Sequence, residues 1–267
     1  MNIQPLSDKF GVEISDFDIS PSPSDEEIAQ IISLLYEQAV VCIRDQNIQP
    51  KDLANFGARF GNPIQHNEVN IRLQGLPTVM CLSNADDRDD RQLNGGAHWH
   101  TDLIHTEEPA SFTMLHAVAV PPEGGGTLFA SQIAAYEALP VQMKEKIEDM
   151  RIVHCYEGRT DGSMPELLHP LLRLHPASGK KTIYGAADTG IGIVGMDKEE
   201  AMNFYTEIGE FSTQDKFVYR HQYHLNDIVI WDNAQLLHSA EVLQRAKSQQ
   251  ENRIMHRVSV RGWPQGA

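Results

Sequence analysis

The sequence predicts a mainly β fold with helices packed on it, an α+β protein built around one β core. From about residue 77 onward, short runs rich in β-branched and aromatic residues alternate with clusters of Gly, Pro, Asn and Asp, a rhythm typical of a sandwich or barrel of short strands. Helical periodicity is confined to a few segments. Because no internal repeat, low-complexity tract or linker interrupts the chain, residues 1–267 are expected to form a single domain.

The first elements are expected to be two helices with a strand between them. Segment 24–40 places Ser24 and Glu27 at capping-box spacing and then repeats apolar residues at helical intervals. Segment 40–46 is short and β-branched, as in a buried strand. Segment 49–61 has a proline near its start and a glycine after its end, which predicts a second helix. These helices are expected to pack against the core rather than to carry chemistry.

The later part of the chain is expected to supply most strands. Two helical segments interrupt them: 131–150, which is broken at Pro140, and 197–211. The predicted strands are the runs at 78–84, 111–120, 126–131, 150–156, 171–176, 181–186, 217–223 and 227–233.

Composition excludes several classes of function. A formal charge of -15 at pH 7 repels nucleic-acid phosphates, so no nucleic-acid partner is expected. Apolar runs are too short to cross a bilayer, and the N-terminus lacks the features of a signal peptide, which predicts a cytoplasmic protein without a membrane partner. The 3 cysteines are too few and too widely spaced for a disulfide framework or a thiolate zinc site.

A histidine-rich stretch, GAHWHTDLIH at 96–105, is the first candidate for chemistry. On an extended strand, residues two apart point to the same side, so His100 and Asp102 can reach one metal ion. His98 shares this parity. An isolated H-x-D pattern is also common at polar surfaces, so the prediction requires a further ligand from elsewhere in the chain.

His238 is the candidate for that further ligand, because it follows the strongly apolar strand predicted at 227–233. Two histidines and one carboxylate on one face of an octahedron leave open positions, which suits Fe(II) that binds an organic cosubstrate and O2. Zinc prefers a tetrahedral set and would perform hydrolysis. Two alternatives stay open: a cupin-like metal-dependent hydrolase or isomerase that uses His98 with His100, and a binding protein without turnover.

The segment NRIMHRVSVRG at 252–262 predicts a strand that carries cations on one side. Arg253 and Arg257 share a face with Met255, and His256 lies on the other. Arginine binds carboxylates in bidentate fashion and keeps its charge at any working pH. Two such arginines in an acidic protein predict a site for anions.

Five blocks in series resemble the taurine and chlorophenoxyacetate dioxygenase family of Fe(II)- and 2-oxoglutarate-dependent oxygenases. The likeness extends from the N-terminal helix to about Gly262, in the order and at the spacing of that family. The blocks are WHTD at 99–102, PPEGGGTLFASQIAAYEALP at 121–140, HPLLRLHPASGKKTIYGA at 169–186, DIVIWDNAQLLH at 227–238 and RIMHR at 253–257.

The resemblance implies a double-stranded β-helix, or jelly roll, with Fe(II), 2-oxoglutarate and O2 as cofactor and cosubstrates. By position it implies that iron is bound by His100, Asp102 and His238. It further implies that Thr127 and Arg253 hold the distal carboxylate of 2-oxoglutarate. No catalytic side chain beyond the metal centre is expected.

The activity that the resemblance implies is hydroxylation of a C–H bond in a small anionic substrate, a sulfonate, phosphonate, aryloxy acid or other carboxylic acid, with release of succinate and CO2. Arg257 matches the arginine that meets the substrate's anionic group, and His66 is a second candidate for that contact. His98 and His105 flank the metal motif, and segment 157–168 is a candidate lid. A homodimer or homotetramer is expected.

Overall fold

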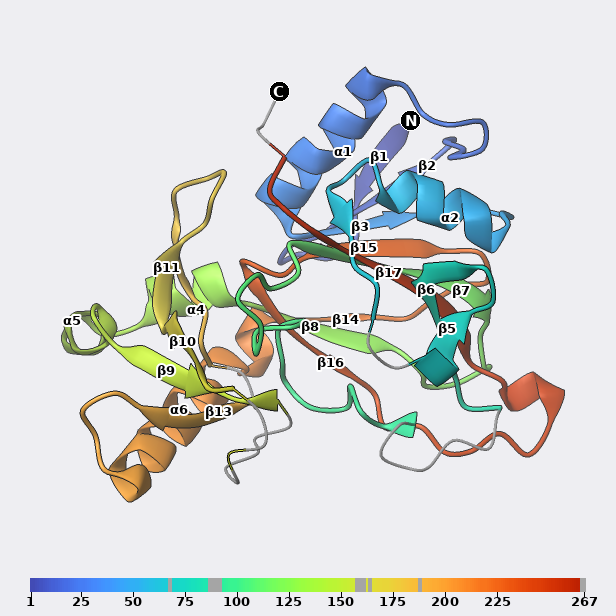
Figure 1. The fold of residues 1–267 in the computed structure, drawn as a ribbon. Helices are drawn as coiled ribbons and strands as arrows, with labels where there is room; N and C mark the ends of the chain where they lie inside the picture. Colours follow the sequence, from blue (N-terminus) through green and yellow to red (C-terminus); the bar gives the residue numbers. More distant parts are fainter. Residues whose placement is uncertain (67–68, 86–92, 157–161, 163–164, 187–188, 265–267) are drawn as a thin grey trace.

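The computed structural model describes residues 1–66, 69–85, 93–156, 162, 165–186 and 189–264 (Figure 1). Its largest sheet runs in the order β1-β2-β3-β15-β7-β17-β6-β5, with β4 paired to β17. All its pairings are antiparallel except β2 with β3. Its strands are β1 Asn2–Pro5, β2 Val12–Ser15, β3 Val40–Ile43, β4 Asn62–Pro63, β5 Arg72–Leu73, β6 Leu76–Ser83, β7 Phe112–Ala119, β15 Ile228–Asp232 and β17 Ile254–Arg261.

A smaller antiparallel sheet packs against one face of the large sheet. Its order is β14-β8-β16, with β14 Val218–His221, β8 Thr127–Ser131 and β16 Leu236–Ala240. The apolar core between the sheets includes Phe129 of β8 and Trp231 of β15, whose ring centroids lie 5.6 Å apart. This arrangement confirms the predicted β core, and it pairs β8, which begins at Thr127, with β16, which carries His238.

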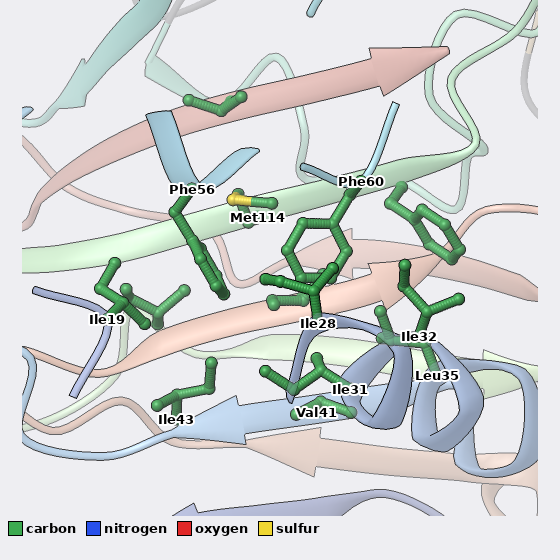
Figure 2. Close-up of a cluster of buried hydrophobic side chains, with 14 of the residues drawn as sticks. Ile19, Ile28, Ile31, Ile32, Leu35, Val41, Ile43, Phe56, Phe60 and Met114 are labelled. Carbon is green, nitrogen blue, oxygen red and sulfur yellow. The ribbon is translucent and has the colours of Figure 1, made fainter. Parts of the chain in front are cut away.

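Two helices cover the opposite face of the large sheet. In Figure 2, the apolar side chains of α1 (Asp25–Gln38) lie over Val41 and Ile43 of β3, next to Phe56 of α2 (Pro50–Gly57). Ser24 caps α1 in the predicted manner: its hydroxyl accepts from the Glu27 N–H at 3.2 Å, and its own N–H donates to the Glu27 carboxylate at 2.8 Å. Such a cap stabilises a helix by about 1 kcal/mol.

A third layer packs beside the small sheet (Figure 1). The predicted break at Pro140 is confirmed, since α4 ends before it and α5 begins after it. An apolar cluster that includes Ile147, Ile152 and Phe204 holds this layer together. Its elements are α4 Gln132–Ala138, α5 Val141–Ile147, α6 Lys198–Ser212, β9 Arg151–His154, β10 Leu167–Pro170, β11 Leu172–Leu174, β12 Lys181–Ile183 and β13 Gly190–Ile193.

Within the described residues, short 3-10 helices are η1 Val69–Ile71, η3 Asp215–Phe217 and η4 Gln249–Glu251. The sequence did not predict β1, β2, β4, β5, β10, β13 or β16. β1 is largely exposed, and β13 reads Gly-Ile-Gly-Ile, so neither offers a run of β-branched residues. Across the described part of the chain, no helix is both long and apolar enough to span a bilayer.

The turn between β15 and β16 is fixed by a buried carboxylate. Asp232 accepts from His175 Nε2 at 2.7 Å, from the Ala234 N–H at 2.8 Å and from Gln235 Nε2 at 2.9 Å. The His175 ring donates through Nε2, because its Nδ1 accepts from the Ser178 N–H at 3.0 Å. This turn sets where β16 begins and therefore where His238 lies.

We expect Asp232→Ala to lower the free energy of unfolding by about 2 to 6 kcal/mol, because the buried His175 Nε2–H and Ala234 N–H lose their acceptor at roughly 1 to 3 kcal/mol each. Gln235 Nε2 keeps the Leu35 and Tyr36 carbonyls as acceptors. Chemical denaturation measures the loss. Asp149→Ala, at an exposed position after α5, serves as the control and should stay within about 0.5 kcal/mol of the wild type. Equal stability of the two variants would contradict the role of Asp232.

Candidate metal centre

Three of the predicted ligands come together between the sheets. Ligand atoms of His100, Asp102 and His238 all lie within 4.8 Å of one another. His100 Nε2 is 3.8 Å from Asp102 Oδ1, and His238 Nε2 is 3.6 Å from Asp102 Oδ2. The segment that carries His100 runs antiparallel to β16: the His100 N–H donates to the His238 carbonyl at 3.0 Å, and the reverse bond measures 2.9 Å.

The His100 ring is prepared to act as a neutral ligand. Its Nδ1 lies 2.8 Å from the His98 carbonyl, so Nδ1 carries the proton and Nε2 faces Asp102 with a free lone pair. Burial, aided by His238, lowers the pKa of His100 to about 3. A neutral imidazole with its second N–H bonded to a carbonyl is the usual form of a metal-binding histidine.

Asp102 is held in the ionised form and in a fixed orientation. Burial opposes its ionisation, but Arg257, His238 and His100 keep the pKa of the carboxyl well below its usual range. Thr113 Oγ1 donates to Oδ2 at 2.6 Å, and Arg257 Nη2 donates to Oδ1 at 2.5 Å. The carboxylate therefore carries its charge at neutral pH and cannot rotate freely.

The expectation of an extended strand through Asp102 is wrong. The ladder to β16 stops at His100, and the chain then turns, with Leu103 in the left-handed region at φ 59°. Asn233 anchors the turn, because its Oδ1 accepts from the Asp102 N–H at 3.3 Å. His100 and Asp102 converge through this turn rather than through strand periodicity.

A buried arginine lies near the start of β8, the strand that pairs with β16 and its metal ligand His238. Arg253 is only 5% exposed, and burial lowers its pKa. Its Nε donates to the Gly125 carbonyl at 2.7 Å, and its guanidinium lies over the Tyr223 ring. The Tyr223 hydroxyl lies 3.0 Å from Thr127 Oγ1. Within the described residues, no carboxylate forms an ion pair with Arg253. A buried cation without a counter-ion is costly, so this pocket fits an anion.

The other residues predicted for the site are Arg257, His66, His105 and the candidate lid. Arg257 is engaged with Asp102, and its Nε donates to Ser259 at 3.2 Å. His66 and His105 both line a cavity of about 510 Å³ that adjoins Leu103. Burial and then Arg257 lower the pKa of His66 to about 4, so its ring is neutral at pH 7. Most of the candidate lid, residues 157–161 and 163–164, lies outside the described residues.

His98 does not join the ligand group. Its ring centroid lies 4.8 Å from that of His100, but the atoms that converge belong to His100, Asp102 and His238. The contribution of His98 to the site is its backbone carbonyl. The geometry therefore gives no support to a hydrolase or isomerase site built on His98 with His100.

Sequence reasoning missed the polar residues that hold Asp102. Thr113 lies in the apolar run of β7, and its hydroxyl also contacts Asn233 Nδ2 at 3.2 Å and Ser259 Oγ at 3.0 Å. A threonine in a β-branched strand normally reads as a strand former, so the sequence offers no signal for this role. The role of Thr113 follows only from its contacts in the folded protein with Asp102, Asn233 and Ser259.

We expect Thr113→Val to weaken Fe(II) binding by about 10- to 100-fold, the usual effect of removing a partner that orients a metal ligand. Valine keeps the shape of the side chain and removes only the donor to Asp102. Anaerobic titration with Fe(II) measures the affinity, with Thr206→Val on the exposed side of α6 as the control. An unchanged affinity in Thr113→Val would show that the hydroxyl does not orient the ligand.

A second group of buried side chains also contains residue types that can bind a metal ion. Ligand atoms of Cys42, His221 and Asp227 also lie within 4.8 Å of one another. Here Arg44 donates to Asp227 Oδ2 at 2.7 Å, and its Nη2 also pairs with Glu13 at 2.8 Å. The carboxylate is already neutralised by an arginine, so this group is a buried ion-pair network.

The donor set of the first group fits Fe(II). Two imidazoles and one ionised carboxylate are borderline to hard ligands, and their ligand atoms lie within 4.8 Å of one another. Arg253 and Thr127 lie at the start of β8, which pairs with the ligand-bearing β16, and this buried cation suits a dicarboxylate cosubstrate. When bound, Fe(II) with 2-oxoglutarate and O2 supplies the oxidising chemistry, and the protein supplies binding and orientation.

Known proteins resemble this chain over most of its length. The 2,4-dichlorophenoxyacetate dioxygenase of Cupriavidus pinatubonensis (strain JMP 134 / LMG 1197), which is alpha-ketoglutarate-dependent, is 31% identical over 258 residues, covering 88% of this chain and 90% of that protein. The alpha-ketoglutarate-dependent sulfonate dioxygenase of Saccharomyces cerevisiae is 26% identical over 268 residues, covering 91% of this chain and 63% of that protein.

A solved structure shares the fold. The crystal structure of AAD-2 in complex with Mn(II) and N-oxalylglycine superimposes with a TM-score of 0.85 at 28% identity, covering 100% of this chain and 99% of that chain. The sequence model described as "Taurine catabolism dioxygenase TauD, TfdA family" matches residues 2–259. The expected double-stranded β-helix is thereby confirmed. The chain belongs to the TauD/TfdA family and is a non-haem iron dioxygenase that uses Fe(II), 2-oxoglutarate and O2.

Proposed function

We propose that this enzyme hydroxylates a C–H bond of a small anionic organic substrate, with succinate and CO2 as the products of 2-oxoglutarate. Relatives named for sulfonates, 2,4-dichlorophenoxyacetate, (S)-phenoxypropionate and sulfate esters support a substrate of this class. The single observation that carries the proposal is the buried Arg253, which forms no ion pair among the described residues and lies by Tyr223 and Thr127 at the start of β8, the strand that pairs with β16 and its metal ligand His238.

In this proposal, His100, Asp102 and His238 hold Fe(II) on one side, which leaves the opposite side for cosubstrate and O2. Thr127 and Arg253 bind the distal carboxylate of 2-oxoglutarate. The hydroxyl of Thr127 is a donor at the pocket, and the arginine supplies the countercharge, so the cosubstrate is fixed in one orientation.

Arg257 and His66 are proposed to contact the anionic substrate near the metal. Nη2 of Arg257 is already bonded to Asp102, so its contribution to the substrate comes from the other terminal nitrogen. His66 is neutral at pH 7 and therefore contributes a hydrogen bond rather than a charge. The protein's main task is to place the oxidised carbon next to the metal, and no side-chain nucleophile is required.

The test is anaerobic addition of Fe(II) and then 2-oxoglutarate to the purified protein. Chelation of the ferrous ion by the keto acid should give a weak metal-to-ligand charge-transfer band in the visible, and later admission of air should yield succinate. A panel of sulfonates, phosphonates and aryloxy acids should raise succinate formation above the uncoupled background. A wild-type protein that binds Fe(II) and 2-oxoglutarate without this band would contradict the proposal.

We further propose that residues 1–267 form one domain, that the protein is cytoplasmic, and that it assembles as a homodimer or homotetramer. The first statement is supported by the large sheet, which contains both β1 near the N-terminus and β17 near the C-terminus. Light scattering coupled to gel filtration measures the assembly, and a monomer at micromolar concentration would contradict it.

A further inference from the structure

A run of glycines, Gly124 to Gly126, leads into β8 and forms a loop beside Arg253. The carbonyl of Gly125 accepts from Arg253 Nε at 2.7 Å, so the loop fixes one end of the guanidinium. A Cβ atom at Gly125, whose φ is 72°, would lie 3.0 Å from Arg253 Cδ. The glycine loop therefore packs directly on the side chain that is proposed to bind the distal carboxylate of 2-oxoglutarate, and its position decides where that guanidinium lies.

The segments that follow β14 and β16, the two neighbours of β8, hold the glycine loop on both sides (Figure 1). After β16, the Glu241 N–H donates to the Gly126 carbonyl at 3.1 Å, and Glu241 Oε2 accepts from the Gly126 N–H at 2.9 Å. After β14, Gln222 Nε2 donates to the Gly124 carbonyl at 2.8 Å. A Cβ atom at Gly126 would lie 2.6 Å from the His221 carbonyl oxygen, so only glycine fits there. The Glu241 carboxylate therefore anchors the loop on the β16 side.

Glu241 carries a negative charge near Arg253, and a surface arginine compensates it. Glu241 Oε1 accepts from Arg220 Nε; the Arg220 side chain is 58% exposed and that of Glu241 is 19% exposed. Burial opposes ionisation of this carboxyl, but the hydrogen bonds from Arg220 and Gly126, and then the charges of Arg220 and Arg253, lower its pKa. Burial lowers the pKa of Arg253, and Tyr223 and Glu241 oppose that shift. Glu241 is therefore ionised at neutral pH, within electrostatic reach of the cation that 2-oxoglutarate needs.

We propose that Glu241 and Arg220 are positioning residues for 2-oxoglutarate. Glu241 fixes the glycine loop and, through the Gly125 carbonyl, the Arg253 guanidinium. Arg220 neutralises Glu241, so this carboxylate neither draws the Arg253 guanidinium away nor repels the distal carboxylate of the cosubstrate. The inference rests on the proposed function, in which Arg253 binds that carboxylate. Two residues that do not themselves bind the cosubstrate thereby set its affinity.

Calorimetry on the Mn(II)-loaded protein compares the binding of 2-oxoglutarate with that of 2-oxopentanoate, which has a methyl group in place of the distal carboxylate. We expect Glu241→Ala to weaken 2-oxoglutarate binding by about tenfold or more, the loss typical of one hydrogen bond to a charged group. Glu241→Gln keeps an acceptor for the Gly126 N–H and should recover most of this loss. Arg220→Gln should weaken binding by about two- to fivefold, the range of a partly exposed ion pair. None of these variants should alter the binding of 2-oxopentanoate.

The double variant Arg220→Gln/Glu241→Ala should bind 2-oxoglutarate like Glu241→Ala alone, because Arg220 acts through Glu241. Lys216→Gln, which removes an exposed cation just before β14, is the matched control and should bind both acids like the wild type. Unchanged 2-oxoglutarate affinity in Glu241→Ala or Arg220→Gln, losses that add in the double variant, or equal losses for both acids would overturn the inference. A wild type that binds the two acids equally well would instead contradict the role of Arg253 in the proposed function.

Discussion

Replacing Asp102 with alanine is expected to abolish succinate formation and to weaken Fe(II) binding by more than the roughly 10- to 100-fold loss typical of a mutated outer partner. The variant removes the only carboxylate of the three converging side chains. It also leaves the Arg257 guanidinium without its counter-ion next to the cation site, so repulsion adds to the lost ligand. Anaerobic Fe(II) titration and succinate assays measure the two effects.

His98→Ala is the control for this variant. Because His98 supports His100 through its backbone carbonyl, alanine preserves that bond, and Fe(II) affinity and succinate formation should stay close to wild type. Loss of activity in His98→Ala together with retention in Asp102→Ala would overturn the ligand assignment and favour a site built on His98 with His100.

Replacing Arg253 with leucine should raise the dissociation constant of 2-oxoglutarate by roughly 30- to 4,000-fold, which corresponds to about 2 to 5 kcal/mol for the loss of a buried ionic partner. The free energy of unfolding without cosubstrate should fall little, because the variant also removes a buried cation that has no carboxylate partner in the described residues. Fe(II) affinity without 2-oxoglutarate should not change. Calorimetry, denaturation and Fe(II) titration separate these quantities.

Arg151→Leu, at the exposed first position of β9, is the control for nonspecific effects of charge removal. The Michaelis constant for 2-oxoglutarate offers an independent check of the Arg253 assignment. If that constant is the same in Arg253→Leu and in the wild type, Arg253 does not hold the distal carboxylate.

Local patterns in the sequence were sufficient for the helices and most strands. The α1 cap at Ser24 and the break at Pro140 are properties of neighbouring residues, so they could be predicted without knowledge of the fold. β13 could not be predicted, because its alternating glycines carry little strand preference and its pairing with β9 is supplied from elsewhere in the chain.

In the candidate site, too, some features could be predicted from the sequence and others could not. His100, Asp102 and His238 could be proposed from residue type and a family resemblance, and the structure brings them together. The bonds that orient Asp102 could not be predicted, since Thr113 reaches it from another strand. The pairing of Arg257 with Asp102 was missed for the same reason, and strand periodicity alone led to the wrong expectation of an extended segment there.

The reciprocal backbone bonds between His100 and His238 join two segments that are far apart in the chain. Contacts of such large sequence separation carry a high loop-closure cost and tend to form late in folding. An unfolded chain therefore has no assembled Fe(II) site, and Fe(II) binding should occur only in molecules that have finished folding. Ferrous ion should in turn shift the thermal midpoint upward with its concentration, because it binds the native ensemble preferentially.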